Sequence, residues 1–201
     1  EFNGNFMYWH SDADPSNFKA CWRQVAQSIR STAPNVLLDW TVNAHGGPVP
    51  SGGNMYTAYP GDDVVDIVGT DSYDHYPPSR NQAEWDAQCN KGGGFGVCDI
   101  IKFAREHKKK FAVGEWGVAM GSDDGGGDNP FYVEKMFDLF KKNSDILAYE
   151  AYYNAPLSIE PNNVGSGIAA PLGSVDAPKS AATYVALYKD PTIQSTTIQP
   201  S

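Results

Sequence analysis

Strands that alternate with helices along the chain predict an α/β fold with a parallel sheet, of the (β/α)8 TIM-barrel type. Four apolar runs have the composition of buried strands, and each run ends in polar and aromatic side chains. A barrel of this type exposes its functional groups at the carboxyl-terminal ends of its strands. We therefore expect residues 1–201 to form a single unit that makes up part of such a barrel.

Apolar periodicity and capping residues give the expected elements in order. The strands are expected at residues 36–42, 64–71, 110–117 and 146–154, and the helices at residues 15–32, 99–107, 130–140 and 180–188. The first helix is expected to open at Asp14-Pro15-Ser16 and to end near Thr32-Ala33-Pro34. The sequence Asp128-Asn129-Pro130 is expected to cap the third helix, because Pro is favoured in the first turn.

The strand count falls short of a closed barrel. Four strands can be placed, and residues 1–8 could supply the end of a fifth, whereas a barrel has eight. Either the chain is a fragment, or the other half of the barrel is a separate or removed segment. A compact half-barrel is the least favoured alternative, because it would leave a long sheet edge unpaired.

Charge and hydropathy exclude two classes of partner. The formal net charge is −9, and Lys108, Lys109 and Lys110 form the one basic run, so we expect no nucleic acid as a partner. No window of the sequence reaches the roughly 18 to 20 apolar residues that span a bilayer, and we expect no membrane association.

Three cysteines carry information about the compartment. Cys89 and Cys98 flank a glycine-rich stretch that is flexible enough to bring the two sulfurs together, which predicts a disulfide. A disulfide indicates an oxidising compartment, and hence a secreted protein. The alternative is two unrelated buried thiols. Cys21, on the first helix, is expected to be a free core residue.

Two glutamates are candidates for acid and nucleophile chemistry. Glu115 lies between glycines and a tryptophan at the end of an apolar strand, where a charge is costly unless it has a purpose. Glu1 precedes a polar turn and several aromatic residues. Glycoside hydrolysis needs one carboxylic acid that protonates the leaving oxygen and one carboxylate that attacks the sugar or activates water.

Three motifs together are similar to those of glycoside hydrolase family 26. The stretch Glu1-Phe2-Asn3-Gly4-Asn5-Phe6-Met7-Tyr8-Trp9 resembles the acid/base motif of that family, and residues 59–73 resemble its sixth-strand signature. Gly114-Glu115-Trp116-Gly117 stands where the family carries its nucleophile. The resemblance implies a retaining enzyme without metal or cofactor, of which this chain covers about strands 4 to 8, and an N-terminal half that lies elsewhere.

Further site residues follow from the resemblance. Tyr73 would hydrogen-bond the nucleophile Glu115, while Phe6 and Trp9 would line the sugar cleft beside the acid Glu1. Asn3 and Trp116 would contact the substrate within the same motifs. Tyr153-Asn154 stands where the family usually has Trp-Asn, so the aromatic platform under the cleaved sugar is a tyrosine here.

The residues themselves suggest additional sugar contacts. Aromatic side chains make up 12% of the chain, and flat aromatic faces stack on sugar rings. Asp39, Trp40, Asn43 and His45 cluster near one strand end and could bind hydroxyl groups, although Asp39 and Trp40 point to opposite faces of a regular strand. For His45, a loop histidine with a structural hydrogen bond is an equal alternative.

These observations favour an endo-acting β-glycanase with a polysaccharide or oligosaccharide substrate. The resemblance implies β-1,4-mannan as the main substrate, with β-1,3-1,4-glucan and xylan as alternatives within the same fold. A non-catalytic carbohydrate-binding half-barrel is the rival from another class. An enzyme that acts on an acidic polymer is disfavoured by the negative charge of the chain.

Overall fold

The structure is a computed structural model of the chain. It describes residues 1–4, 7–11, 14–44, 54–121, 123–157, 166–168 and 175–189.

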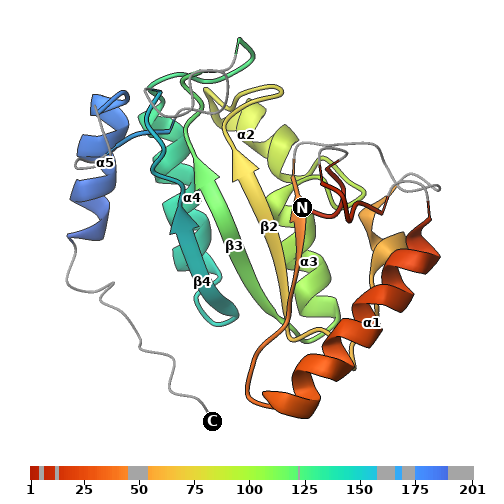
Figure 1. The fold of residues 1–201 in the computed structure, drawn as a ribbon. Coiled ribbons are helices and arrows are strands. Elements are labelled where there is room, and N and C mark those ends of the chain that lie inside the picture. Colours follow the sequence, from red (N-terminus) through yellow and green to blue (C-terminus); the bar gives the residue numbers. More distant parts are fainter. Residues whose placement is uncertain are drawn as a thin grey trace.

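Four parallel strands form one sheet in the order β1-β2-β3-β4, which confirms the predicted parallel α/β fold. The strands are β1 (Asp39–Asn43), β2 (Ile67–Tyr73), β3 (Lys110–Gly117) and β4 (Leu147–Tyr152). Their carboxyl ends meet at the upper edge of the sheet in Figure 1. Within the described part of the chain the sheet is open at β1 and β4, so it accounts for half of the eight strands of a complete barrel.

Helices cover one face of this sheet. They are α1 (Pro15–Thr32), the short 3-10 helix η1 (Met55–Ala58), α2 (Gln82–Cys89), α3 (Val97–Glu106), α4 (Pro130–Lys142) and α5 (Pro178–Tyr188). Figure 1 shows α3 and α4 behind β2 and β3. Between these layers lies the main core, in which Val68, Phe111 and Val113 of the sheet are fully buried together with Ile100 and Met136 of the helices.

Helix α1 begins where the sequence predicts it. Asp14 Oδ1 accepts hydrogen bonds from the backbone N–H groups of Ser16 and Asn17, which are the orphan donors of the first turn. Arg30 in the last turn pairs with Asp66 at 3.0 Å and so ties the helix to the segment before β2. None of the described helices is long and apolar enough to cross a membrane.

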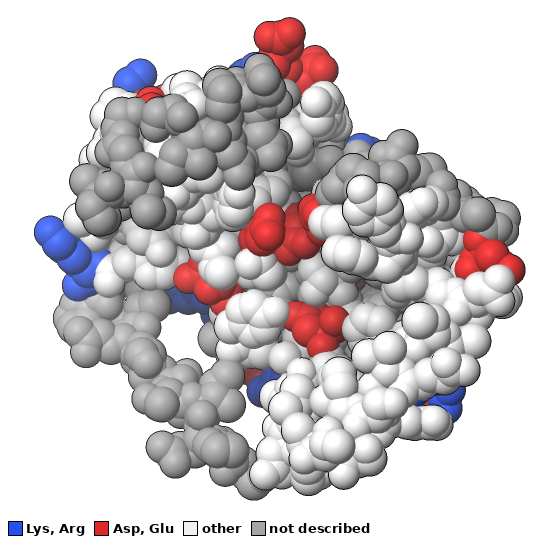
Figure 2. Space-filling model, in the orientation of Figure 1, with Lys and Arg blue, Asp and Glu red and all other residues white. Residues whose placement is uncertain are grey.

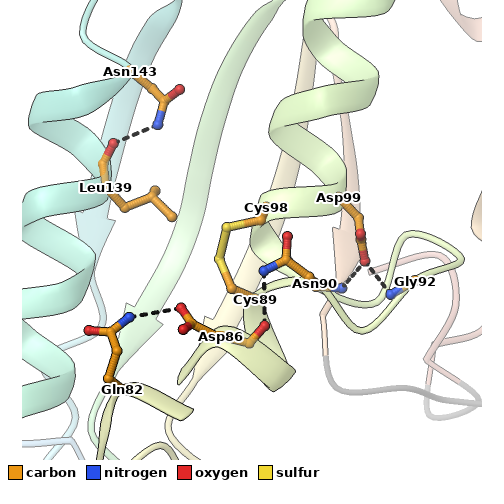
Figure 3. Close-up of a disulfide and its surroundings, with 10 residues drawn as sticks. Gln82, Asp86, Cys89, Asn90, Gly92, Cys98, Asp99, Leu139 and Asn143 are labelled. Carbon is orange, nitrogen blue, oxygen red and sulfur yellow. Dashed lines mark hydrogen bonds between the residues drawn. A yellow bond between two sulfur atoms is a disulfide. The ribbon is translucent and has the colours of Figure 1, made fainter. Parts of the chain in front are cut away.

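The disulfide between Cys89 and Cys98 is present, as predicted, and joins the end of α2 to the beginning of α3 (Figure 3). The glycine-rich loop between them is closed by Asp99, whose Oδ2 accepts hydrogen bonds from the backbone N–H groups of Gly92 and Gly96. Cys21 is free, but the prediction that it lies in the core is wrong. It is exposed on α1 and borders a hollow beside the N-terminal segment.

The expected cap of α4 also differs from the observed one. Asn129 is the N-cap residue of α4 but accepts no hydrogen bond from the first turn of that helix. Asp128 serves α5 instead, because its carboxylate accepts from the backbone N–H groups of Lys179 and Ser180. A single acidic residue therefore connects the loop after β3 to the first turn of α5.

Some boundaries were shifted in the prediction. Strand β1 begins at Asp39 rather than at residue 36, and β2 runs from Ile67 to Tyr73 rather than over residues 64–71. Residues 1–4 and 7–11 form turns and not a fifth strand. The prediction missed η1 and α2, which are only four and eight residues long and lack a long apolar stripe.

Candidate active site

The pairing of the strands brings polar side chains into one row at the carboxyl edge. Asn43 of β1 pairs with Asp71 of β2, and Asp71 pairs with Glu115 of β3. Figure 2 shows acidic side chains gathered on the face of the sheet that the helices leave uncovered. The row therefore faces the side on which a substrate could approach.

A bulge in β3 decides where Glu115 points. Thr70 pairs with Val113, but the next residue, Asp71, pairs with Glu115, so Gly114 is an extra residue in β3. Without the bulge, strict alternation would place Glu115 on the helix-covered face together with Val113. The extra residue moves Glu115 to the side of Tyr73, in keeping with the tendency of bulges to re-aim side chains at active sites.

Glu115 is half-buried and receives a direct hydrogen bond. The hydroxyl of Tyr73 donates to Glu115 Oε2 at 2.7 Å, so the predicted contact between these two residues is confirmed. Burial raises the pKa of Tyr73, and the bond to Glu115 raises it further, so the phenol remains a donor. This arrangement orients one carboxylate oxygen and leaves the other for chemistry.

Glu1 lies next to the same edge. Its backbone nitrogen donates to the carbonyl oxygen of Thr41 at 3.0 Å, and its Oε1 accepts from Asn43 Nδ2 at 2.6 Å. Asn3 fixes the segment, since it donates to the Asn43 carbonyl and accepts from the Asn43 N–H. Burial raises the pKa of the Glu1 carboxyl, and the negative charge of Glu115 contributes to the rise.

Asp71 is a site residue that sequence reasoning did not select. It is only 5% exposed, and its Oδ1 has no hydrogen-bond partner among the described residues. Burial, with contributions from the charges of Glu1 and Glu115, raises its pKa to about 7. The available signal was an aspartate at the end of the mostly apolar run of residues 64–71, two residues before Tyr73.

A second polar pair spans the uncovered face. The hydroxyl of Tyr149 on β4 donates to Asp39 Oδ2 on β1 at 2.5 Å, across the two intervening strands. The Gly69 and Gly114 positions lie beneath this pair, and a Cβ at either one would approach the side chains of Asp39 or Asp71 to within 3 Å. Two glycines thus provide the space in which the acidic side chains sit.

Two of the predicted aromatic contacts lie at the site. Trp9 is 63% exposed and, with Glu1, lines a hollow of about 520 Å³ between the N-terminal segment, β1 and α1. The ring of Tyr153 packs edge-on against Tyr73, with 5.9 Å between the ring centroids. Asn154 accepts a hydrogen bond from the backbone of Ile168 at 2.8 Å, which gives it a structural contact.

Other predicted substrate contacts are wrong in position. Trp40 and Trp116 are fully buried and face the helices, where Trp40 stacks on Phe2 and Trp116 packs against Phe140. Trp40 faces the helices because side chains alternate along β1, which places Trp40 and Asp39 on opposite faces, as expected from the sequence. Trp116 faces the helices because of the bulge in β3. Asn3 is also fully buried.

Two predicted residues, Phe6 and His45, lie outside the described residues.

A family model for glycosyl hydrolase family 26 matches residues 1–103, just over half of the chain. The chain belongs to glycosyl hydrolase family 26. The matched part includes Glu1, Asp71 and Tyr73 and ends before Glu115. A search of curated proteins found no match to this family-26 chain.

Solved structures share the fold of this family-26 chain. A modular endo-β-1,4-mannanase from Cellulomonas fimi is 23% identical, with a TM-score of 0.62 over 95% of this chain and 39% of its own. The catalytic domain of a Bacillus family-26 endo-β-1,4-mannanase is 22% identical, with a TM-score of 0.64 over 94% of this chain and 48% of its own. A family-26 β-mannanase from Bacteroides ovatus is 21% identical, with a TM-score of 0.59 over 95% of this chain and 48% of its own.

These identities are low, so the likeness establishes the fold. The chain spans less than half of the length of each of these three structures, in agreement with an open sheet of four strands.

Proposed function

We propose that this family-26 chain carries both catalytic carboxylates of a secreted, retaining endo-β-glycoside hydrolase, with β-1,4-mannan as the substrate. The observation that carries the proposal is that two glutamates lie at the carboxyl edge of the sheet and are each held by a hydrogen bond. Glu115 is held by the Tyr73 hydroxyl, and Glu1 is held by the Asn43 amide. Family membership supports the same assignment.

The environments of the two glutamates suit different roles. Burial raises the pKa of the Glu1 carboxyl, which favours the protonated form that a general acid needs to donate to the glycosidic oxygen. Glu115 attacks the anomeric carbon as that bond breaks and forms a glycosyl-enzyme. Glu1, now ionised, takes a proton from water, and the resulting hydroxide releases the sugar from Glu115 with the original anomeric configuration.

The substrate class rests on the aromatic residues and on the solved relatives. Trp9 and Tyr153 offer faces and edges to sugar rings beside Glu1 and Tyr73, and the related structures are named as β-mannanases. β-1,3-1,4-glucan and xylan are the alternative substrates. The disulfide between Cys89 and Cys98 supports secretion, because such bonds persist in oxidising compartments.

The test is the release of reducing ends from mannan, mixed-linkage glucan and xylan by the wild type, Glu115→Gln and Glu1→Gln. Glu106→Gln is the matched control, because Glu106 lies on the exposed side of α3, where it pairs with Lys102. We expect both site variants to lose at least about 1,000-fold in kcat/KM and the control to retain its activity. Near wild-type hydrolysis by both site variants would refute the assignment.

Stereochemistry and binding separate the remaining alternatives. Proton NMR of the first product formed should show the β anomer, as double displacement requires. Binding of a glycan that survives the loss of both glutamates, without any release of reducing ends by the wild type, would instead support a carbohydrate-binding half-barrel.

A further inference from the structure

Tyr76 is an exposed aromatic residue that the proposed catalytic machinery does not use. It follows β2 by three residues and is 52% exposed. Its backbone has a φ of 55°, which is unfavourable for a residue with a bulky side chain. Such strain persists where the surroundings enforce it, and it is common at ligand-binding sites.

The surroundings of Tyr76 hold this conformation from two sides. The backbone N–H of Tyr76 donates to the carbonyl of Asp124, and His75 forms an isolated bridge with Gly125. The loop after β2 is thereby joined to the loop after β3. The join is tight, because a Cβ on Gly126 would lie 1.7 Å from the carboxylate of Asp74.

A line of rings connects Tyr76 to the nucleophile. The ring of Tyr76 packs on His75 with 4.3 Å between centroids, and His75 packs edge-on against Tyr73 at 6.0 Å. Tyr73 in turn donates to Glu115. Burial lowers the pKa of His75 to about 4, so above that pH Tyr76 rests on an uncharged ring. About half of Tyr76 is left exposed to solvent, in the loop that follows the carboxyl end of β2.

We propose that Tyr76 is a sugar-stacking platform, a binding subsite at the rim of the cleft for a pyranose unit remote from the cleaved bond. The inference rests on the proposed function and names a further contact for the same polysaccharide. An uncharged pyranose ring fits an aromatic face backed by a neutral ring, since neither partner needs a counter-ion. A polymer would reach this platform, whereas a short oligosaccharide bound at the carboxylates would not.

The experiment measures binding as a function of ligand length. Glu115→Gln protein, which binds without cleaving, is titrated calorimetrically with mannohexaose and mannobiose, or with the corresponding glucan or xylan oligosaccharides if the wild type hydrolyses those polymers. Introducing Tyr76→Ala into the Glu115→Gln protein should raise the Kd for the hexasaccharide about tenfold and leave the Kd for the disaccharide unchanged. Tyr76→Phe keeps the aromatic face and should restore hexasaccharide binding to within about twofold.

Two further variants separate stacking from folding. Tyr76→Gly accepts the positive φ without strain and removes the ring, so it should weaken hexasaccharide binding as Tyr76→Ala does, even if the alanine variant is less stable. Leu37→Ala, at an exposed site before β1, controls for the loss of a surface apolar side chain and should bind normally.

The outcomes distinguish the two proposals. The platform is refuted if the wild type cleaves a β-glycan but Tyr76→Ala leaves hexasaccharide binding unchanged, or weakens both lengths equally. If the wild type neither binds nor cleaves any of the three glycans, the proposed function fails, and the platform fails with it.

Discussion

Asp71→Asn should make the protein more stable, and by an amount that grows with pH. The pKa of Asp71 is raised from 3.8 to about 7, chiefly by burial, so the folded state holds the proton more tightly than the unfolded chain does. The stability associated with this proton is fully present below pH 3.8 and is lost as the pH rises through 7. A difference of about three pKa units corresponds to roughly 4 kcal/mol at pH 9 and about 1.5 kcal/mol at pH 5.

Asparagine has the shape of aspartic acid and carries no charge, so it avoids this loss at every pH. The gain in the free energy of unfolding for Asp71→Asn should therefore be about 2.5 kcal/mol larger at pH 9 than at pH 5. This difference is independent of any effect of the new amide that is the same at every pH.

Urea denaturation at pH 5, 7 and 9, followed by tryptophan fluorescence, measures these free energies. Asp138→Asn is the matched control for the loss of one negative charge, because Asp138 lies on the exposed side of α4. A gain that is equal at all three pH values, or that shrinks as the pH rises, would refute the account of a buried, proton-binding Asp71.

Three other predictions follow from contacts in the structure. Replacing both Cys89 and Cys98 by alanine should lower the free energy of unfolding by about 2.5 kcal/mol, because the unfolded chain gains the conformational entropy of a loop that the disulfide closes over a separation of nine residues. Urea denaturation measures this loss, and an unchanged midpoint would contradict it. Tyr73→Phe should reduce kcat/KM at least about tenfold with little change in Tm, because it removes only the hydroxyl that donates to the nucleophile; equal activity would show that the bond is not used. Gly126→Ala should cost about 3 kcal/mol of stability, since its Cβ would collide with the Asp74 carboxylate; thermal melting measures the loss, and an unaltered Tm would mean that the loop can move aside.

The order of elements could be predicted because it depends on local patterns. The apolar runs gave all four strands, and β3 was placed at Lys110–Gly117 to the residue. The short helix α2 was missed because eight residues with a weak apolar stripe carry little periodic signal. The disulfide was predictable because glycines between two nearby cysteines permit the closed loop.

The same local reasoning reached only part of the candidate site. Glu115 stands out because a charge at the end of an apolar strand is costly unless it has a purpose, whereas Glu1 was selected through the resemblance of its motif to family 26. Asp71 was passed over, because its importance comes from its neighbours on the adjacent strands and from its burial. Trp116 was assigned to the substrate, whereas the structure places it in the core.

The sequence by itself determined the parallel α/β architecture and the family resemblance, and it selected Glu1 and Glu115 as candidates. Only the tertiary structure decided which side chains share a face. A single extra residue, Gly114, turns Glu115 toward Tyr73 and Trp116 toward α4. The physical reason is that side chains alternate with a period of two, so one unpaired residue reverses every later assignment, and pairing between strands far apart in sequence sets where that residue lies.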